Sequence, residues 1–184
     1  MRANKEIILI ILKRIPDRKH ILPVYGLIVM FDYGWSLLQF FKEVPSWLKF
    51  LTLGEISGIL AYTLAVDFLE SLLILAGLIV ISICLPIKWF HDDFIVRAGV
   101  TVLYSLGFFI FLAYRPNPSY QLNTYIIRGI IDLVFLNLVI KDVSLLRKVI
   151  NSLADRSTVF LYLSIPASLL ALVIVLYRNI SGII

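Results

Sequence analysis

Two acidic residues, Asp67 and Glu70, stand three positions apart inside an otherwise apolar run that covers residues 61–86. On a helix, residues three apart lie one turn from each other on the same face, so the two carboxyl groups can act together. Carboxyl groups in apolar surroundings bind a proton or a cation, or they pair with a base. Other apolar segments also carry charges, and the predicted intramembrane polar cluster comprises Asp32, Asp67, Glu70, Arg128 and Asp132.

The charges of this cluster do not balance, because Arg128 is its single base and its other four members are acids. Glu55, expected near the outer surface, adds a fifth acid. An ionised group in hydrocarbon costs about 2.5 to 3.5 kcal/mol even on the gentler insertion scales, so these groups should face one another or water. One interpretation is a structural network in which Arg128 pairs with an acid of another helix. The other is a hydrated pocket or proton pathway, open to the outside, whose surplus acids are protonated, hydrated or bound to a cation.

The composition places these charges in a membrane protein. Hydrophobic residues make up 60% of the 184 residues and charged residues 16%, against about 45–50% and about 25% in soluble globular chains. Such a chain cannot hide its apolar surface from water. The single cysteine, Cys84, lies in an apolar run, so the sequence predicts a buried thiol and neither a disulfide framework nor a zinc site.

Five apolar segments are long enough to cross a bilayer, for which about 20 residues are needed. They cover residues 21–41, 53–85, 98–114, 122–140 and 159–177. The loops between them are short and contain Pro45, Pro86, Pro116 and Pro118. We therefore predict an all-α, multi-pass integral membrane protein, a five-span helical bundle that forms one domain over residues 1–184.

The second segment is ambiguous, because its roughly 33 residues would form about 50 Å of helix against a hydrocarbon core of about 30 Å. Charge bias favours one long helix over two crossings, since cytoplasmic flanks are rich in Lys and Arg. With five crossings, twelve of the seventeen basic residues lie on the inner side and four on the outer side, with Arg128 inside the fourth segment. We predict a plasma-membrane location with the N-terminus in the cytoplasm and the C-terminus outside.

Two amphipathic segments are predicted to lie in the interface, one at the N-terminus and one between the fourth and fifth spans. In the second, residues 142–157, apolar side chains recur at helical spacing and basic residues stand among the polar positions. Anionic lipid head groups would attract these bases, which accounts for the net charge of +5 without a nucleic-acid partner. A docking site for a cytoplasmic protein is the alternative.

Small residues at spacings of three and four give the second segment a face on which another helix can pack closely. The candidate helix-packing face comprises Gly54, Ser57, Gly58, Ala61 and Ala65. The neighbouring helix could belong to the same chain, to a second copy in a homo-oligomer, or to another membrane protein.

No motif for catalysis appears: GxSxG, HExxH, the P-loop and GxGxxG are all missing from the sequence. We therefore expect no catalytic residues, no bound metal and no cofactor. Two functions from different classes fit the sequence. The first is an accessory or assembly subunit of a membrane complex. The alternative is a small transporter or channel component that binds a cation or a proton-coupled solute through its intramembrane acids.

Overall fold

The computed structural model describes residues 15–85, 90, 93–114, 122–140 and 143–181. Within these ranges the chain forms five long helices. They are α2 (Arg18–Trp47), α3 (Leu53–Cys84), α5 (Phe94–Ala113), α6 (Leu122–Val139) and α7 (Ser144–Ser181). The predicted all-α architecture is therefore confirmed. The predicted N-terminal interfacial helix falls mostly within residues 1–14, outside the described residues.

Four of the helices, α2, α3, α5 and α7, are long and apolar enough to cross a membrane. This agrees with an integral membrane protein that crosses the bilayer several times. The helix α6 is not among the four, so the fifth crossing stays a prediction. Its 18 residues correspond to about 27 Å of helix, close to the thickness of a hydrocarbon core.

The helix α3 is continuous over 32 residues, so the second apolar segment contains no turn at Asp67. A capping box defines its start: the Thr52 side chain accepts a hydrogen bond from the Glu55 amide, and the Glu55 carboxylate accepts one from the Thr52 amide. Glu55 is exposed and serves this helix end, which separates it from the acids deeper in the same helix.

Three local predictions differ from the structure. The sequence predicts a separate interfacial helix at residues 142–157, but residues 144–157 instead form the first part of α7, which runs without interruption for 38 residues. Pro45, predicted to lie in a loop, is inside the last turns of α2. The thiol of Cys84 is exposed on the protein surface, which in a spanning helix places it toward lipid.

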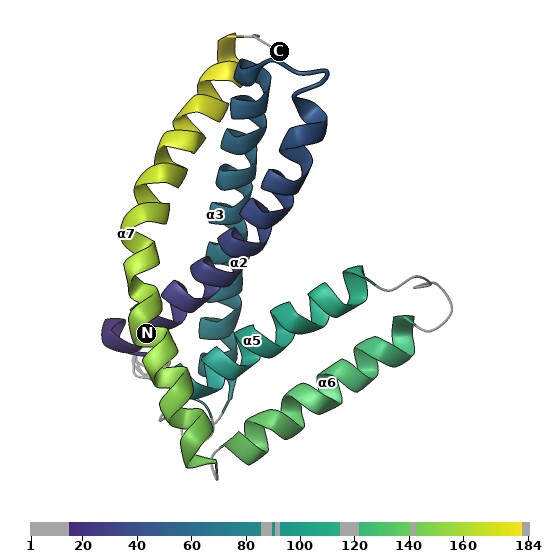
Figure 1. The fold of residues 1–184 in the computed structure, drawn as a ribbon. Coiled ribbons are helices and arrows are strands. Elements are labelled where there is room, and N and C mark those ends of the chain that lie inside the picture. The colour runs from purple at the N-terminus through teal and green to yellow at the C-terminus, as the bar shows by residue number, and fades with distance from the viewer. Residues whose placement is uncertain (1–14, 86–89, 91–92, 115–121, 141–142, 182–184) are drawn as a thin grey trace, which may run out of the picture.

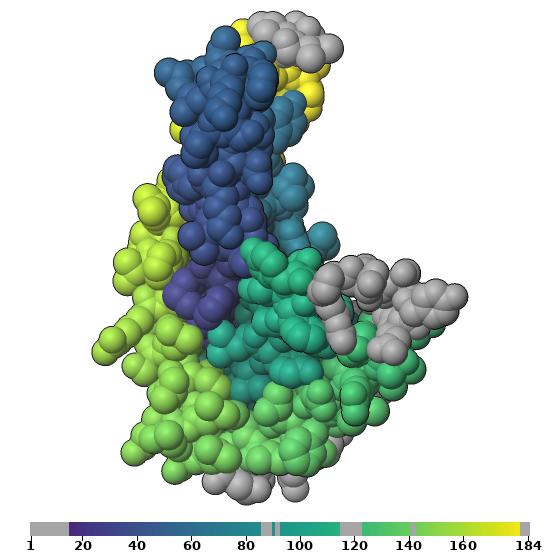
Figure 2. Space-filling view, turned by 45° about the vertical axis from the view of Figure 1, so that its right-hand side comes forward, coloured from purple at the N-terminus to yellow at the C-terminus, as the bar shows by residue number. Residues whose placement is uncertain are grey.

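The helices α2, α3 and α7 form an elongated bundle, and α5 and α6 form an antiparallel hairpin that diverges from it (Figure 1). In the space-filling view the molecule is broader in its lower half, where this hairpin lies, and narrow above it (Figure 2). The helix α5 packs against both α2 and α7, whereas the main neighbour of α6 is α5. One face of α6 is therefore covered, and its large apolar side chains elsewhere are exposed.

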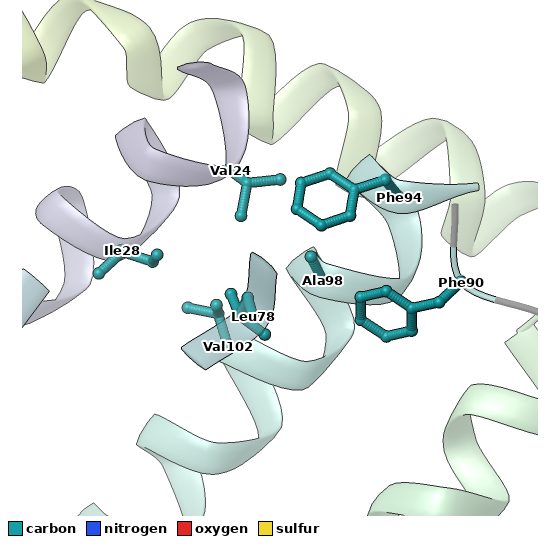
Figure 3. Close-up of a cluster of buried hydrophobic side chains, with 7 residues drawn as sticks. All are labelled: Val24, Ile28, Leu78, Phe90, Phe94, Ala98 and Val102. Carbon is teal, nitrogen blue, oxygen red and sulfur yellow. The ribbon is translucent and has the colours of Figure 1, made fainter. Parts of the chain in front are cut away.

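The best-packed core lies where α5 meets α2 and α3. Seven buried side chains converge there (Figure 3): Val24, Ile28, Leu78, Phe90, Phe94, Ala98 and Val102. On the other side of α2, Gly26 lies directly against the backbone of α7, and a Cβ at this position would be 2.8 Å from the Ser157 carbonyl carbon. The two helices can approach this closely because residue 26 has no side chain.

Candidate functional site

The polar residues of α2 and α3 meet inside the bundle. Asp32 and Asp67 are 7% and 3% exposed, whereas Glu70, one turn further along α3, is exposed. The Ser36 hydroxyl, one turn after Asp32 on α2, donates a 2.8 Å hydrogen bond to Asp67 Oδ1. The structure thus brings three of the five predicted cluster residues to the contact between α2 and α3.

Neither buried carboxyl group is fully satisfied. The second oxygen of each, Asp32 Oδ2 and Asp67 Oδ2, is buried and has no hydrogen-bond partner. A buried carboxylate without a partner is strongly unfavourable, so these groups are stable there only when they carry a proton or meet a cation or water.

A cavity of about 430 Å³ lies beside these acids, between α2, α3 and α5. Its lining residues include the acids Asp32 and Glu70, Ser36, and the aromatic residues Trp35 and Phe109. The other lining residues are Phe31, Leu106, Ile110 and Ala113. Among the residues that the structure describes, no basic side chain lines it. The described lining is therefore mostly apolar, and its charged residues are acids.

The remaining two members of the predicted cluster lie elsewhere. Arg128 and Asp132 are both exposed on α6, and no ion pair joins Arg128 to an acid within the residues that the structure describes. The Asp132 carboxylate instead accepts a 3.4 Å hydrogen bond from the Tyr104 hydroxyl of α5. Since α6 packs on α5 and not on α3, Arg128 does not neutralise the buried acids in this arrangement.

The residues of the candidate helix-packing face of α3 differ in burial. Gly58, Ala61 and Ala65 are buried, whereas Gly54 and Ser57 are exposed near the start of the helix. At Gly58 the neighbour is α7 of the same chain, because the guanidinium group of Arg178 lies directly over the glycine. The absence of a side chain at Gly58 makes room for this group.

Two buried tyrosines of α2 extend the polar contacts, and the sequence analysis did not single them out. Tyr33 and Ser168 of α7 share a 2.7 Å hydrogen bond between their hydroxyl groups. Tyr25 makes a longer one, 3.4 Å, to Ser71 of α3. A seven- to eight-residue spacing of polar residues, as in Tyr25, Asp32 and Tyr33, marks one face of a helix and could have revealed this polar stripe.

Two further polar anchors hold the hairpin and were also missed. Arg97, one of the twelve basic residues counted on the inner side, is buried and donates a 2.9 Å hydrogen bond to the Asn137 carbonyl of α6. The Asn137 amide donates to the Thr101 hydroxyl of α5. At the same end of the molecule, Arg147 and Asp93 form a 2.6 Å salt bridge between α7 and the residue before α5.

The described residues that line the cavity are two acids, one serine, three aromatic residues and three aliphatic residues. Within the described part of the chain, no group of three or more His, Cys, Asp or Glu side chains could hold a metal ion. Among the described lining residues, Ser36 carries the hydroxyl group, and this group donates its hydrogen to Asp67 Oδ1. In comparisons with protein-family models, curated proteins and solved structures, none matched this chain.

Proposed function

We propose that this protein is a small multi-pass membrane protein that binds a cation, or a solute with a cationic group, as a transporter or channel component. One observation carries this proposal: Asp32 is more than nine-tenths buried and has an unpartnered oxygen, and the described lining of its cavity contains a second acid and no base. A cation in the cavity would satisfy the carboxylate that the protein itself leaves unpaired. The proposal assigns the protein no catalytic step.

The helix directions support five crossings. Contacts from Gly26 to Ser157 and from Tyr33 to Ser168 show that α2 and α7 run parallel. The end of α5 lies beside the second half of α2, where Tyr114 accepts a hydrogen bond from Gln39. The start of α7 lies at the opposite end, beside the start of α5. If α5 and α7 both span the bilayer, α6 must carry the chain back across it.

With five crossings, the excess of basic residues near the start of α2 and the start of α7 favours a cytoplasmic N-terminus and an external C-terminus in the plasma membrane. At the start of α7, the exposed bases Lys148 and Arg156 accompany the exposed apolar residues Leu145 and Val149. This combination suits contact with anionic lipid head groups of the inner leaflet.

The proposed cation binding can be tested through stability, because a ligand that binds the folded state raises the unfolding temperature. The full-length protein would be purified in lipid nanodiscs and heated with sodium, potassium, magnesium or an alkylammonium salt. We expect at least one cation to stabilise the wild type and the Glu43→Gln control, whose acid is exposed at the end of α2, but not Asp32→Asn. If no cation stabilises the wild type, the proposal is wrong.

A second function, an accessory or assembly subunit, is favoured by the position of Arg128. This guanidinium group is exposed on α6 and forms no ion pair within the described residues. In a spanning helix an unpaired arginine is unfavourable, and an acid of a partner protein or of a second copy would stabilise it.

The subunit hypothesis predicts an assembly larger than the 21.0 kDa chain in mild detergent. Arg128→Gln should reduce its mass, measured by light scattering after size exclusion, whereas Asn123→Ala, an exposed change on the same helix, should not. A monomer in both the wild type and the variants would contradict this second function.

A further inference from the structure

The walls of the cavity indicate what kind of cation it would hold. Three aromatic residues, Phe31, Trp35 and Phe109, line the same chamber as Asp32 and Glu70. Aromatic faces attract cations through their quadrupole, and cages of aromatic rings with a nearby acid are a common way to recognise alkylated ammonium groups. The combination of rings and carboxylates is therefore better suited to an organic cation than to a small inorganic ion.

An inorganic ion would find too few ligands in this chamber. The oxygen atoms that line it come from Asp32, Glu70 and Ser36, and the described residues contain no group of acids close enough to chelate a metal. Ions such as Ca²⁺ need six to eight oxygen ligands, and Mg²⁺ needs near-octahedral coordination. A volume of about 430 Å³ lies in the range of sites for small organic molecules.

A second cavity, of about 290 Å³, adjoins the first and shares Glu70, Leu106 and Phe109 with it. Its other lining residues are mostly apolar and lie on α3 and α5: Ile74, Gly77, Leu78, Ile81, Thr101, Val102 and Ser105. Together the two cavities form a chamber with acids and aromatic rings at one end and hydrocarbon at the other.

We infer that the ligand of this site is an organic ammonium compound whose cationic head lies by Asp32, Glu70 and Trp35 and whose apolar chain extends into the second cavity. This inference rests on the proposed cation binding and specifies its ligand class. The charged head would take the place of the missing partner of Asp32, while burial of the chain would add affinity for each methylene.

The test uses radiolabelled hexyltrimethylammonium and the full-length protein in nanodiscs, with binding to empty nanodiscs subtracted. Tetramethylammonium, which has the head alone, hexan-1-ol, which has the chain alone, and sodium chloride serve as competitors. We expect saturable binding that hexan-1-ol does not displace. Tetramethylammonium should compete about tenfold less well than unlabelled hexyltrimethylammonium, or worse, because it lacks the buried methylenes.

Two pairs of variants separate the head from the chain. Asp32→Asn should weaken binding of the labelled compound about tenfold or more, and the exposed-acid control Glu43→Gln should not. In Gly77→Leu, hexyltrimethylammonium and tetramethylammonium should bind with nearly equal affinity, because the new side chain occupies the second cavity. A Cβ at Gly77 meets nothing within 4 Å, so the helix tolerates the change. The control is Gly107→Leu, equally open but outside both cavities.

If Asp32→Asn fails to fold, Trp35→Leu gives a further measurement. Trp35→Leu should weaken the binding of the ammonium compounds without changing any stabilisation by sodium. If sodium stabilises the wild type through Asp32 but hexyltrimethylammonium shows no saturable binding, the site binds a cation and the ligand class inferred here is wrong. If neither binds, both the inference and the proposed function are wrong. Equal effects of Gly77→Leu and Gly107→Leu would overturn the placement of the chain.

Discussion

Single polar atoms hold the helices of this bundle in register. The hydroxyl groups of the buried Tyr25 and Tyr33 and of the half-buried Ser36 each reach a different partner on α3 or α7. In hydrocarbon such bonds between helices contribute about 0.6 kcal/mol on average and at most about 1.7 kcal/mol. They specify which faces meet more than they supply stability, because lipid is as apolar as the packed side chains.

At this scale we predict that Tyr33→Phe lowers the free energy of unfolding by about 1 kcal/mol, because the hydroxyl bond to Ser168 is lost while the ring stays in place. Thermal unfolding in nanodiscs measures the loss. Tyr62→Phe is the control, since its hydroxyl donates a 3.2 Å bond to Asn179 on the exposed side of the bundle. In a double-mutant cycle, Ser168→Ala should add little to Tyr33→Phe. Full additivity would show that the two hydroxyl groups do not interact.

Helix packing at the level of whole elements depends on where glycine allows close approach. Gly26 meets the backbone of α7, and Gly99 lies against Ile150 of α7, where a Cβ would be 2.7 Å from the Ile150 side chain. The atoms packed against Gly26 and Gly99 cannot move aside, so an added methyl group cannot be accommodated unless a helix moves.

Gly26→Ala should therefore destabilise the protein by about 1 to 3 kcal/mol. Gly34→Ala, on the same helix with nothing within 4 Å of the added Cβ, should be neutral or stabilising by up to about 1 kcal/mol through helix propensity. Unfolding temperatures of the two variants in one detergent give the comparison. Equal effects at the two positions would contradict the close crossing of α2 and α7.

The elements also show what the sequence could and could not predict. Long apolar runs predicted the positions of α3, α5 and α6 within a few residues, because a helix in lipid must satisfy its own backbone. The continuity of α7 was missed, since the amphipathic pattern of its first turns resembles an interfacial helix. The separation of Arg128 from Asp67 depends on which helix lies beside which, and periodicity within one segment carries no such information. The hydrogen bond between Ser36 and Asp67 could not be predicted for the same reason.

At the scale of the whole molecule, α2 and α7 run parallel, so the start of α2 and the end of α7 lie at opposite ends. Lys19 stands at the start of α2 and Asn179 near the end of α7, and both are exposed. If both helices span the bilayer in parallel, these residues face opposite compartments. The orientation proposed from the basic residues would put Lys19 on the cytoplasmic side.

We predict that Asn179→Cys, made in a Cys84→Ser background, reacts with a membrane-impermeant maleimide added to intact cells. Lys19→Cys in the same background should react only after the membrane is permeabilised. Reaction of both cysteines from the same side would contradict the parallel spanning arrangement of α2 and α7. The reverse pattern would leave the five crossings intact and invert the orientation.

The hydrogen bond between Tyr33 and Ser168 joins residues 135 positions apart, and this separation has a consequence during translation. When α2 enters the membrane, the partner of its Tyr33 hydroxyl has not yet been synthesised. The helices α5 and α6 are also synthesised before that partner, and α5 packs against α2. The ribosome must therefore deliver most of the chain before the bundle can close, and until then the Tyr33 hydroxyl lacks its bond to Ser168.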